Sequence, residues 1–491
     1  MTFKLSNTLK GSAGEFHKKP GEEVTFYTCG PTVYDFAHIG NFRSFVFEDL
    51  LRRALEFAGC RVKHVMNITD VDDKTIAGAN REGKELNAFT AQYIQAFRED
   101  LKTLNIFEPN GTDPGYRLLQ PRATEEIPSM IALISKLIEK GHAYASDGSV
   151  YYRVASFQNY GRLSNKKLEH NIQGARVDVD EYEKEEGSDF VLWKKCKEGE
   201  PAWDSPWGKG RPGWHIECSA MSMKYLGESF DMHAGGEDLI FPHHENEIAQ
   251  SEAATGKPFV RFWLHCKFLL VNGEKMSKSK GNFYTLRDLL AQGHDSMAIR
   301  YALLAVHYRT PLNFTMDSLK EAAEVIKRLD DAYFQCLNYV KNPLFAETPA
   351  EEGMFLKGIL DTHMSAIQTS LAEDLNISQA LAQLFDVTLT VNRLMVNFPG
   401  KNCRQNMMDA VAFFKKVDRL LGLDIASVED IDPDVLKMLD HRREARARKD
   451  FTESDRIKAA LDEKGWLVKD GKPGEPSTVK KKRRTWDFKK S

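Results

Sequence analysis

Residues 24–70 hold the feature that most restricts the fold of this chain, an apolar strand, a helix and a second strand in close succession. VTFYTCGPTV (24–33) is typical of a strand that runs into a turn, and RVKHVMNITD (61–70) alternates like a second strand. Between them, residues 38–59 carry an apolar helical face and end at Gly59. This is a βαβ unit, and such units build parallel sheets, so we expect an α/β fold with a Rossmann-type parallel sheet.

The α/β pattern is interrupted and then resumes. The Asp147-Gly148 turn between two apolar stretches predicts a hairpin in an inserted α+β subdomain. Residues 201–214, dense in Pro, Gly and Trp, are typical of a loop. A second α/β portion then follows through FDMH (230–233), a helix over about 242–254 and a strand, FWLHCKFLLV (262–271).

Beyond about Thr310 the strand signals fade and long segments of helical period appear, which predict a helical bundle. Residues 434–465 are typical of a charged helix or helix pair, and KDGKPGEPST (469–478) is expected to loosen into a basic tail. A chain of 491 residues is long enough for several domains. We expect the following boundaries: first half of the Rossmann-type domain 1–118, connective insertion 119–212, second half of the Rossmann-type domain 213–315, helical bundle 316–430, and C-terminal region 431–491.

The distribution of charge and the cysteine content indicate which partners and which cellular compartment to expect. The formal net charge of −3 gives no indication of a polyanionic partner, but the C-terminal stretch KKKRRTWDFKKS combines seven basic residues with Trp486 and Phe488. Such a tail fits RNA, whose phosphates pair with cations and whose unstacked bases pack on aromatic rings, although it can equally be a disordered, solubilising end. Seven scattered cysteines do not form a disulfide framework, and neither a secretory signal nor a long apolar run is present. We therefore expect a cytoplasmic protein without a membrane span.

FPHHENE (241–247) raises the question of a metal site. The protease pattern His-Glu-x-x-His fails because position 248 is Ile248, which removes the main support for a zinc hydrolase. His243 and Glu247 are four apart, so on a helix they share a face and can reach one ion. A polar helix start after Pro242, with imidazoles bonded to backbone or solvent, remains the alternative at this point.

Two further motifs point to ATP. CGPTVYDFAHIGN (29–41) ends a strand and opens a helix at His38, and helix N-termini bind phosphate, which Gly40 allows to approach closely. Lys275-Met-Ser-Lys278-Ser is a lysine-bearing loop that can close over a triphosphate. This pair resembles the signature motifs of class I aminoacyl-tRNA synthetases. The resemblance implies ATP binding by His38, Gly40 and Lys278 on a Rossmann-type fold, with Gly236 and Asp238 in GGEDL at the adenosine-contacting turn.

CGPTVYD, GRPGWHIECSAM and FPHHENEIAQSEAATG together resemble cysteinyl-tRNA synthetases over nearly the whole chain. The resemblance implies one zinc ion, held by Cys29, Cys218, His243 and Glu247, to which the substrate thiolate adds. His243 rather than His244 is the ligand by resemblance, whereas spacing alone allows either. Two thiolates, an imidazole and a carboxylate are reasonable zinc ligands. By the same resemblance, Thr69, Trp214 and His233 line the amino-acid pocket.

The chain departs from the family pattern at two places. The first motif normally ends in a second histidine, and here that position is Asn41, which can donate a hydrogen bond but carries no charge. The anticodon-reading residues implied by the resemblance are Arg446, Phe451, Asp455 and Asp470, with Phe451 where the family often has tryptophan. The other cysteines match no ligand position and are interpreted as packing residues: Cys60, Cys196, Cys266, Cys336 and Cys403.

The resemblance implies a monomeric enzyme that joins L-cysteine to tRNA(Cys) with ATP and Mg²⁺ through a cysteinyl-adenylate. His38, Asn41, Lys275 and Lys278 are the expected catalytic residues, because placement and electrostatics dominate this chemistry. One alternative is a ligase of the mycothiol type, which gives cysteine to an amino sugar and needs no anticodon-reading end. Another is a catalytically silent RNA-binding relative, of which Asn41 is the first sign.

Overall fold

The computed structural model describes residues 2–107, 118–166, 189–345, 356–397, 404–471 and 476–483. It divides into two compact units. Unit 1 comprises Met1–Leu286 and Tyr308–Asn313, and unit 2 comprises Arg287–His307 and Phe314–Ser491. Among the described residues, none of the helices combines the length and the apolarity that crossing a bilayer requires.

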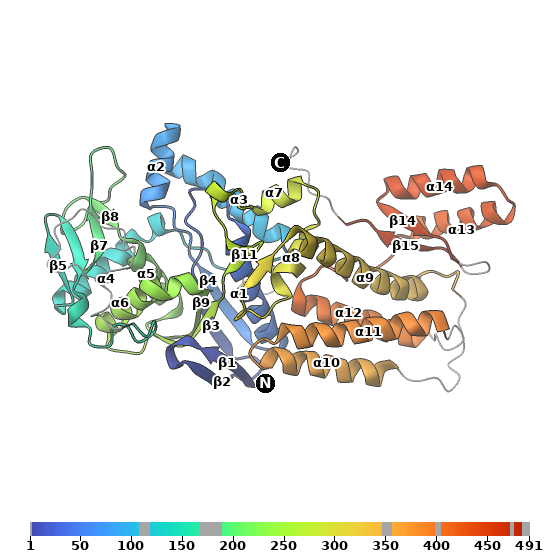
Figure 1. Cartoon of the computed structure of the whole chain (residues 1–491), viewed down its shortest axis with the longest axis horizontal. Coiled ribbons are helices and arrows are strands. Elements are labelled where there is room, and N and C mark those ends of the chain that lie inside the picture. The colour runs from blue at the N-terminus through green and yellow to red at the C-terminus, as the bar shows by residue number, and fades with distance from the viewer. Residues whose placement is uncertain are drawn as a thin grey trace. The chain divides into compact units, whose positions relative to one another are not determined.

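The core of unit 1 is a four-stranded parallel sheet, which confirms the α/β prediction (Figure 1). Its strands lie in the order β10 (Val260–Cys266), β9 (Phe230–Gly236), β3 (Glu23–Thr28) and β4 (Arg61–Met66), and each neighbouring pair is parallel. The strand order reverses direction between β3 and β9. In open α/β sheets, ligands bind beside the carboxyl ends of the strands at such a switch point.

Three helices of this unit each carry residues of the expected site. Helix α1 (Ile39–Phe57) follows β3, packs against β4 and β9, and stops just before Gly59 as its sequence predicts. Helix α5 (Trp214–Leu226) packs against β3 and β4. Helix α6 (Glu245–Thr255) packs on α5 and precedes β10. The helix was predicted from about residue 242, but Ile240–His244 instead form a π-helical turn with a cis Phe241-Pro242 bond.

A second sheet lies between β4 and β9 in the sequence. It is antiparallel, in the order β5 (Ala143–Ser146), β6 (Ser149–Tyr152), β7 (Phe190–Lys195) and β8 (Gly210–Pro212). The hairpin at Asp147-Gly148 is as predicted. The prediction of a loop over 201–214 was wrong at β8, whose residues are buried against β7. Three helices precede or flank this sheet: α2 (Asp73–Glu82), α3 (Leu86–Thr103) and α4 (Ile127–Glu139).

Two small sheets in this part of the chain were not predicted. One is an N-terminal hairpin of β1 (Thr2–Asn7) and β2 (Ser12–His17). The other has the order β12 (Glu274–Lys275), β11 (Leu269–Val271) and β13 (Leu312–Phe314). The stretch 262–271 therefore forms two strands, β10 and β11, where one was expected, and the lysine-bearing loop follows directly on β12.

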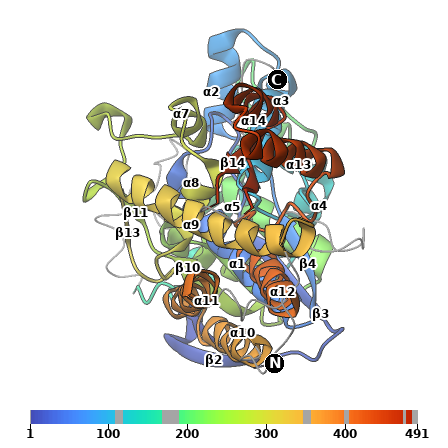
Figure 2. The ribbon, with the colours of Figure 1, turned by 90° about the vertical axis from the view of Figure 1, so that its right-hand side faces the viewer.

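Unit 2 is a helical bundle, as the 3.6-residue period predicts. Figure 2 shows α10 (Leu356–Ala372), α11 (Ile377–Asn397) and α12 (Arg404–Leu421) gathered beneath α9 (Met316–Lys341). Helix α12 had not been predicted. Two shorter helices, α7 (Leu286–Ala291) and α8 (Ser296–Leu304), precede the bundle.

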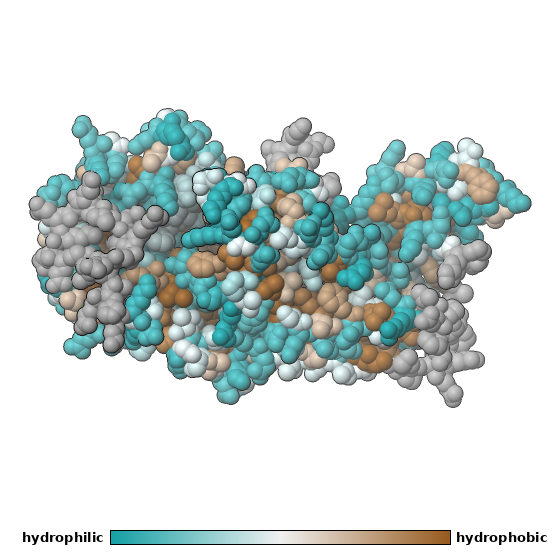
Figure 3. Space-filling view, in the orientation of Figure 1, coloured by the Kyte–Doolittle hydropathy of each residue, from teal (hydrophilic) through white to brown (hydrophobic). Residues whose placement is uncertain are grey.

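The C-terminal part of unit 2 consists of α13 (Pro433–Ala447), α14 (Phe451–Glu463) and a hairpin of β14 (Trp466–Lys469) and β15 (Thr478–Lys481). The helix pair is as predicted, whereas Lys480 and Lys481, which were expected to begin a basic tail, belong to β15. On the face shown in Figure 3, hydrophilic residues predominate over α13 and α14. Residues 484–491, with Trp486 and Phe488, lie outside the described residues.

Candidate metal centre and nucleotide site

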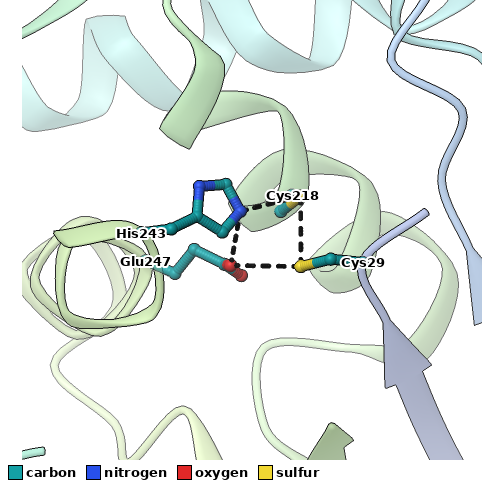
Figure 4. A group of neighbouring side chains, drawn as sticks. All are labelled: Cys29, Cys218, His243 and Glu247. Carbon is teal, nitrogen blue, oxygen red and sulfur yellow. Dashed lines mark hydrogen bonds and ion pairs between the residues drawn. The ribbon is translucent and has the colours of Figure 1, made fainter. Parts of the chain in front are cut away.

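Four side chains converge at the switch point of the parallel sheet (Figure 4). Cys29 directly follows β3, Cys218 lies on α5, His243 lies in the π-helical turn before α6, and Glu247 lies in the first turn of α6. One ligand atom from each lies within 4.8 Å of all the others. Cys218, His243 and Glu247 are buried, and Cys29 is partly exposed. The structure thus brings together all four residues that the resemblance assigned to zinc.

The individual distances describe a closed ring of donors. His243 Nε2 lies 3.1 Å from Glu247 Oε1 and 3.4 Å from Cys218 Sγ. Cys29 Sγ lies 3.9 Å from Cys218 Sγ and 3.8 Å from Glu247 Oε1. The helical spacing of four does place His243 and Glu247 together, although His243 itself lies in the π-helical turn before α6.

A second group of donors overlaps the first within the described residues: Cys29, His233, His244 and Glu247. His244 Nε2 lies 3.4 Å from Cys29 Sγ, and its Nδ1 lies 2.8 Å from His265 Nε2. The structure therefore leaves both histidines of FPHHENE beside the cluster. The first group differs in offering two sulfur donors, which favours a thiophilic metal such as zinc.

The charges of this cluster are mutually dependent. Burial raises the pKa of the Cys29 thiol well above its usual value. Burial has the same tendency at Cys218, but the hydrogen bond from Cys29 and the charge of His243 outweigh it and lower the pKa of Cys218 to about 6. Burial opposes the charging of His243, yet the nearby Cys218 and Glu247 raise its pKa to about 10. These shifts favour a thiolate at Cys218 and an imidazolium at His243, and a cation bound to this donor set would displace the protons of its ligands.

Of the three residues predicted for the amino-acid pocket, Trp214 and His233 contact the cluster, and Thr69 contacts the residue next to Cys218. The Trp214 ring stacks on His243 with centroids 4.2 Å apart, and it is 40% exposed. His233 Nε2 lies 3.1 Å from Glu247 Oε2. Thr69 Oγ1 donates to Glu217 Oε2 at 2.8 Å, one residue before Cys218.

Sequence reasoning missed several residues that support the cluster. Asn67 Oδ1 accepts from Gly30 N at 3.0 Å and lies 3.6 Å from Cys218 Sγ, so it connects the end of β3 to α5. His215 Nδ1 lies 2.9 Å from His243 Nδ1. His265 is buried in β10, and a histidine within the apolar run FWLHC was the available signal for it.

The first motif builds the N-terminus of α1. His38 is the N-cap, and its Nδ1 accepts from Asn41 N at 3.2 Å while Asn41 Oδ1 accepts from His38 N at 3.1 Å. This reciprocal capping box gives Asn41 a structural role that a charge-based comparison overlooks. Burial lowers the pKa of His38, and the charge of Lys278 acts in the same direction.

Two glycines of the expected ATP site lie where a larger residue would collide. A Cβ at Gly40 would come within 2.9 Å of Met276 Cε and 3.0 Å of the His38 ring. A Cβ at Gly236 would overlap Asp238 Oδ1. Burial raises the pKa of Asp238, which lies in the 3₁₀ turn Glu237–Leu239 after β9.

The lysine-bearing loop lies against the segment before α1. Lys278 Nζ pairs with Asp35 Oδ2, which raises the pKa of the lysine, and lies 5.2 Å from the Phe283 ring centroid. The His38 ring contacts the same Phe283 ring edge-on, with centroids 5.3 Å apart. Lys275 lies in β12, exposed, with Nζ over the Phe268 ring. His38 and Lys278 thus share one aromatic neighbour.

The predicted anticodon residues lie on the C-terminal helices and hairpin of unit 2. Arg446 of α13 pairs with Asp470, which follows β14, at 3.3 Å. Phe451 opens α14 with 61% of its surface exposed, and Asp455 lies one turn later on the same helix. An exposed ring and exposed polar side chains are suited to an unstacked base.

The remaining described cysteines do not join the cluster. Cys60, Cys266 and Cys336 are buried, as expected of packing residues, whereas Cys196 is partly exposed. Cys403 lies outside the described residues.

Comparisons with known proteins agree with this geometry. Residues 15–324 match the family described as tRNA synthetases class I (C) catalytic domain. The chain is 46% identical over 486 residues to a cysteine–tRNA ligase of Chlamydia muridarum, with 96% of this chain and 99% of the relative covered. It is 47% identical over 481 residues to a cysteine–tRNA ligase of Solibacter usitatus, with 96% and 99% covered. A Mycobacterium tuberculosis methionyl-tRNA synthetase has the same fold, with a TM-score of 0.61 at 14% identity over 85% of this chain and 94% of that one.

Proposed function

The chain belongs to the cysteine–tRNA ligases, a family of class I aminoacyl-tRNA synthetases, and from this premise we propose that it joins L-cysteine to tRNA(Cys) and recognises the thiol with zinc. The observation that carries the proposal is the cluster of Cys29, Cys218, His243 and Glu247 at the sheet switch point.

The donor set fits zinc better than a hard cation. Two sulfurs, one imidazole nitrogen and one carboxylate oxygen match zinc ligation, whereas magnesium and calcium prefer oxygen throughout. When bound, zinc supplies a Lewis-acidic centre to which the thiolate of the substrate can add. A zinc ion with four protein ligands has no open position for the substrate. Glu247 is therefore the ligand that we expect to move when the thiolate of the substrate binds. The neighbouring bonds from His233 and His215 orient the Glu247 and His243 side chains.

Thiol ligation explains how serine is rejected. Serine differs from cysteine by one atom, and an apolar pocket separates such near-isosteres by only about 10²-fold. A metal with thiolate preference reads the sulfur directly, because a hydroxyl does not ionise easily at neutral pH. Trp214, Thr69 and His233 are the proposed lining of the amino-acid pocket.

We assign the ATP phosphates to the N-terminus of α1 and the adjoining loop. The cysteine carboxylate attacks the α-phosphorus and pyrophosphate leaves, which gives cysteinyl-adenylate. The ribose hydroxyl of the tRNA terminus then attacks the acyl carbon and AMP leaves. His38 and Asn41 at the helix start, with Lys275 and Lys278, stabilise the phosphate charge, and Mg²⁺ accompanies ATP. Gly236 and Asp238 are the proposed adenosine contacts.

We assign the anticodon of the tRNA to unit 2, through Arg446, Phe451, Asp455 and Asp470. Their exposure, and the absence of any need for them in chemistry on a small acceptor, favour this reading over the ligase of the mycothiol type. We propose that the enzyme acts as a cytoplasmic monomer, in keeping with its family resemblance and with the free thiols among the described cysteines.

The test is aminoacylation of total tRNA with labelled cysteine, run beside labelled serine and beside chelator-treated enzyme. Cysteine-specific charging that is lost with the metal and returns with added zinc is expected. Cysteine-dependent pyrophosphate exchange without charging would favour the amino-sugar ligase instead. Loss of both reactions in the zinc-loaded enzyme would indicate the silent relative.

A further inference from the structure

We propose that Asn338 of α9 is a positioning residue for tRNA recognition, because its side chain fixes the C-terminal hairpin and thereby the Arg446–Asp470 pair. This inference rests on the proposed function, since a positioned anticodon contact matters only if the chain charges tRNA. Every residue involved belongs to unit 2.

Asn338 is fully buried in α9, and its amide bonds to both backbone groups of one residue of β15. Its Oδ1 accepts from Val479 N at 2.9 Å, and its Nδ2 donates to Val479 O at 2.7 Å. Nδ2 also donates to Phe334 O in the preceding turn. The Asn338 amide thus pairs with the backbone of Val479 in the way that a peptide group of a neighbouring strand would. This pairing lies on the edge of β15 that faces α9. Few other side chains offer a donor and an acceptor in this arrangement.

Further bonds continue the contact along both elements; together with Asn338 and Val479 they form the α9–β15 seam. Asn342 Nδ2 donates to Ser477 O at 3.4 Å, and Lys480 Nζ bonds to Asp331 at 2.7 Å. Arg483 forms two bonds to Asp330, at 2.8 and 2.5 Å.

The two sides of the seam run in opposite directions and match in length. From Asp330 to Asn342 the helix rises about 18 Å. From Ser477 to Arg483 an extended chain spans at most about 20 Å. Because the bonds are directional and side chains alternate along a strand, a slip of one residue would turn Val479, which is 1% exposed, away from its buried site. The seam therefore specifies the register of the hairpin.

The seam is connected to the proposed anticodon contacts through Ser477. Its Oγ donates to Asp470 Oδ1 at 3.1 Å and accepts from Arg442 Nη1 at 3.2 Å. Asp470 also accepts from the buried Arg442 at 2.5 Å and pairs with Arg446. A displacement of β15 is thus transmitted to Arg446 and Asp470 without any change in their own side chains.

The first test compares Asn338→Leu with the wild type. The substitution keeps side-chain size but removes both bonds to Val479. We expect kcat/KM for full-length tRNA to fall about tenfold, chiefly through KM. Pyrophosphate exchange, and charging of an acceptor-stem fragment that lacks the anticodon, should be unchanged. Asn338→Asp, which keeps the acceptor but loses the donor, should give an intermediate loss.

The second test uses two adjacent residues of equal charge and decides the matter even if Asn338→Leu does not fold. Arg483→Gln removes the bonds to Asp330 of α9 and to the carbonyls of Leu423 and Asp424, whereas Lys482→Gln removes a contact to Asp462 of α14 at 2.8 Å. If the seam positions the hairpin, Arg483→Gln raises the KM for tRNA clearly more than Lys482→Gln does. Equal effects of the two variants, or an equal loss on the acceptor-stem fragment, would overturn the proposal. Failure of the wild type to charge tRNA would instead overturn the proposed function.

Discussion

Lys278 Nζ lies 2.5 Å from Asp35 Oδ2, although the two residues are 243 positions apart in the sequence. The pair joins the lysine-bearing loop to the segment that leads into α1. Both partners are substantially exposed, with 67% and 36% of their side-chain surface accessible. The Asp35 carboxylate therefore pairs with the same Lys278 ammonium group that we assign to the phosphates of ATP. This ion pair must break when ATP binds.

Asp35→Asn is expected to lower the KM for ATP in pyrophosphate exchange. An exposed ion pair is worth up to about 1 kcal/mol, so the change should be at most about fivefold and should shrink at high salt. Glu274→Gln is the matched control, because it breaks the pair of Lys280 with Glu274 at 2.8 Å in the same loop and leaves Lys278 intact. A higher KM for ATP in Asp35→Asn would mean that the carboxylate assists binding.

His243→Asn is expected to abolish zinc binding, whereas His244→Asn is expected to retain it. The reason is that only the group with His243 contains both sulfur donors. The measurement is the zinc content per chain after dialysis against a chelator. If His244→Asn lost zinc and His243→Asn kept it, the metal would instead be assigned to the second donor group: Cys29, His233, His244 and Glu247.

Cys218→Ala is expected to lose both the metal and the discrimination against serine, because it removes one of the two sulfurs. Zinc content and the ratio of kcat/KM for cysteine and serine in pyrophosphate exchange are the readouts. A variant that kept its zinc and its selectivity would refute the assignment of the site. Cys336→Ala serves as a control, since Cys336 is a buried cysteine of unit 2.

Gly40→Ala is expected to slow pyrophosphate exchange by about 10- to 100-fold with little change in melting temperature. The Met276 tip can move aside, but the His38 ring, which accepts from Asn41 N, must shift by a few tenths of an ångström to make room for the added Cβ. Gly358→Ala, where an added Cβ meets nothing within 4 Å, should leave the rate unchanged. Unaltered exchange in Gly40→Ala would show that His38 tolerates displacement.

The ion pairs of Asp470 with Arg442 and Arg446 should make the stability of the C-terminal hairpin depend on pH in the acidic range. The hydrogen bond from Arg442 lowers the pKa of Asp470, with the charges of Arg442 and Arg446 acting in the same direction. The stabilisation is complete above the unfolded pKa of about 3.9 and disappears as the pH falls through the lower folded value. Thermal melts of the wild type and Asp470→Asn should therefore differ at pH 7, begin to approach each other only below about pH 4, and converge once the pH is below the folded pKa. A difference that persists in acid would contradict this.

The sequence was most informative where periodicity and motif agreed. The strand before Cys29, the helix from Ile39 and the strand from Arg61 form as predicted, because a buried parallel sheet demands continuous apolar runs that few other arrangements satisfy. The four candidate metal ligands also meet. Their convergence could not follow from spacing, since Cys218 and Cys29 are brought together only by the packing of α5 on β3.

The failures have physical reasons as well. The hairpin of β14 and β15 was missed because Gly and Pro between its strands predict disorder, while the bonds that stabilise β15 come from Asn338, far away in the sequence. The basic charges of Lys480 and Arg483 suggested a free tail, yet both pair with acids of α9. Asn67 and His265 carried no motif, and their roles depend on contacts between separate strands and helices.

The ligand ring also has a consequence for synthesis of the chain. Cys29 and Glu247 lie 218 residues apart. At about 5–20 residues per second, roughly 10–40 s pass on the ribosome between translation of the first ligand and the last. Throughout that interval Cys29 lacks its carboxylate partner Glu247, and Cys218 and His243 are translated only near its end. The complete donor set that we propose for zinc therefore exists only after Glu247 has been translated.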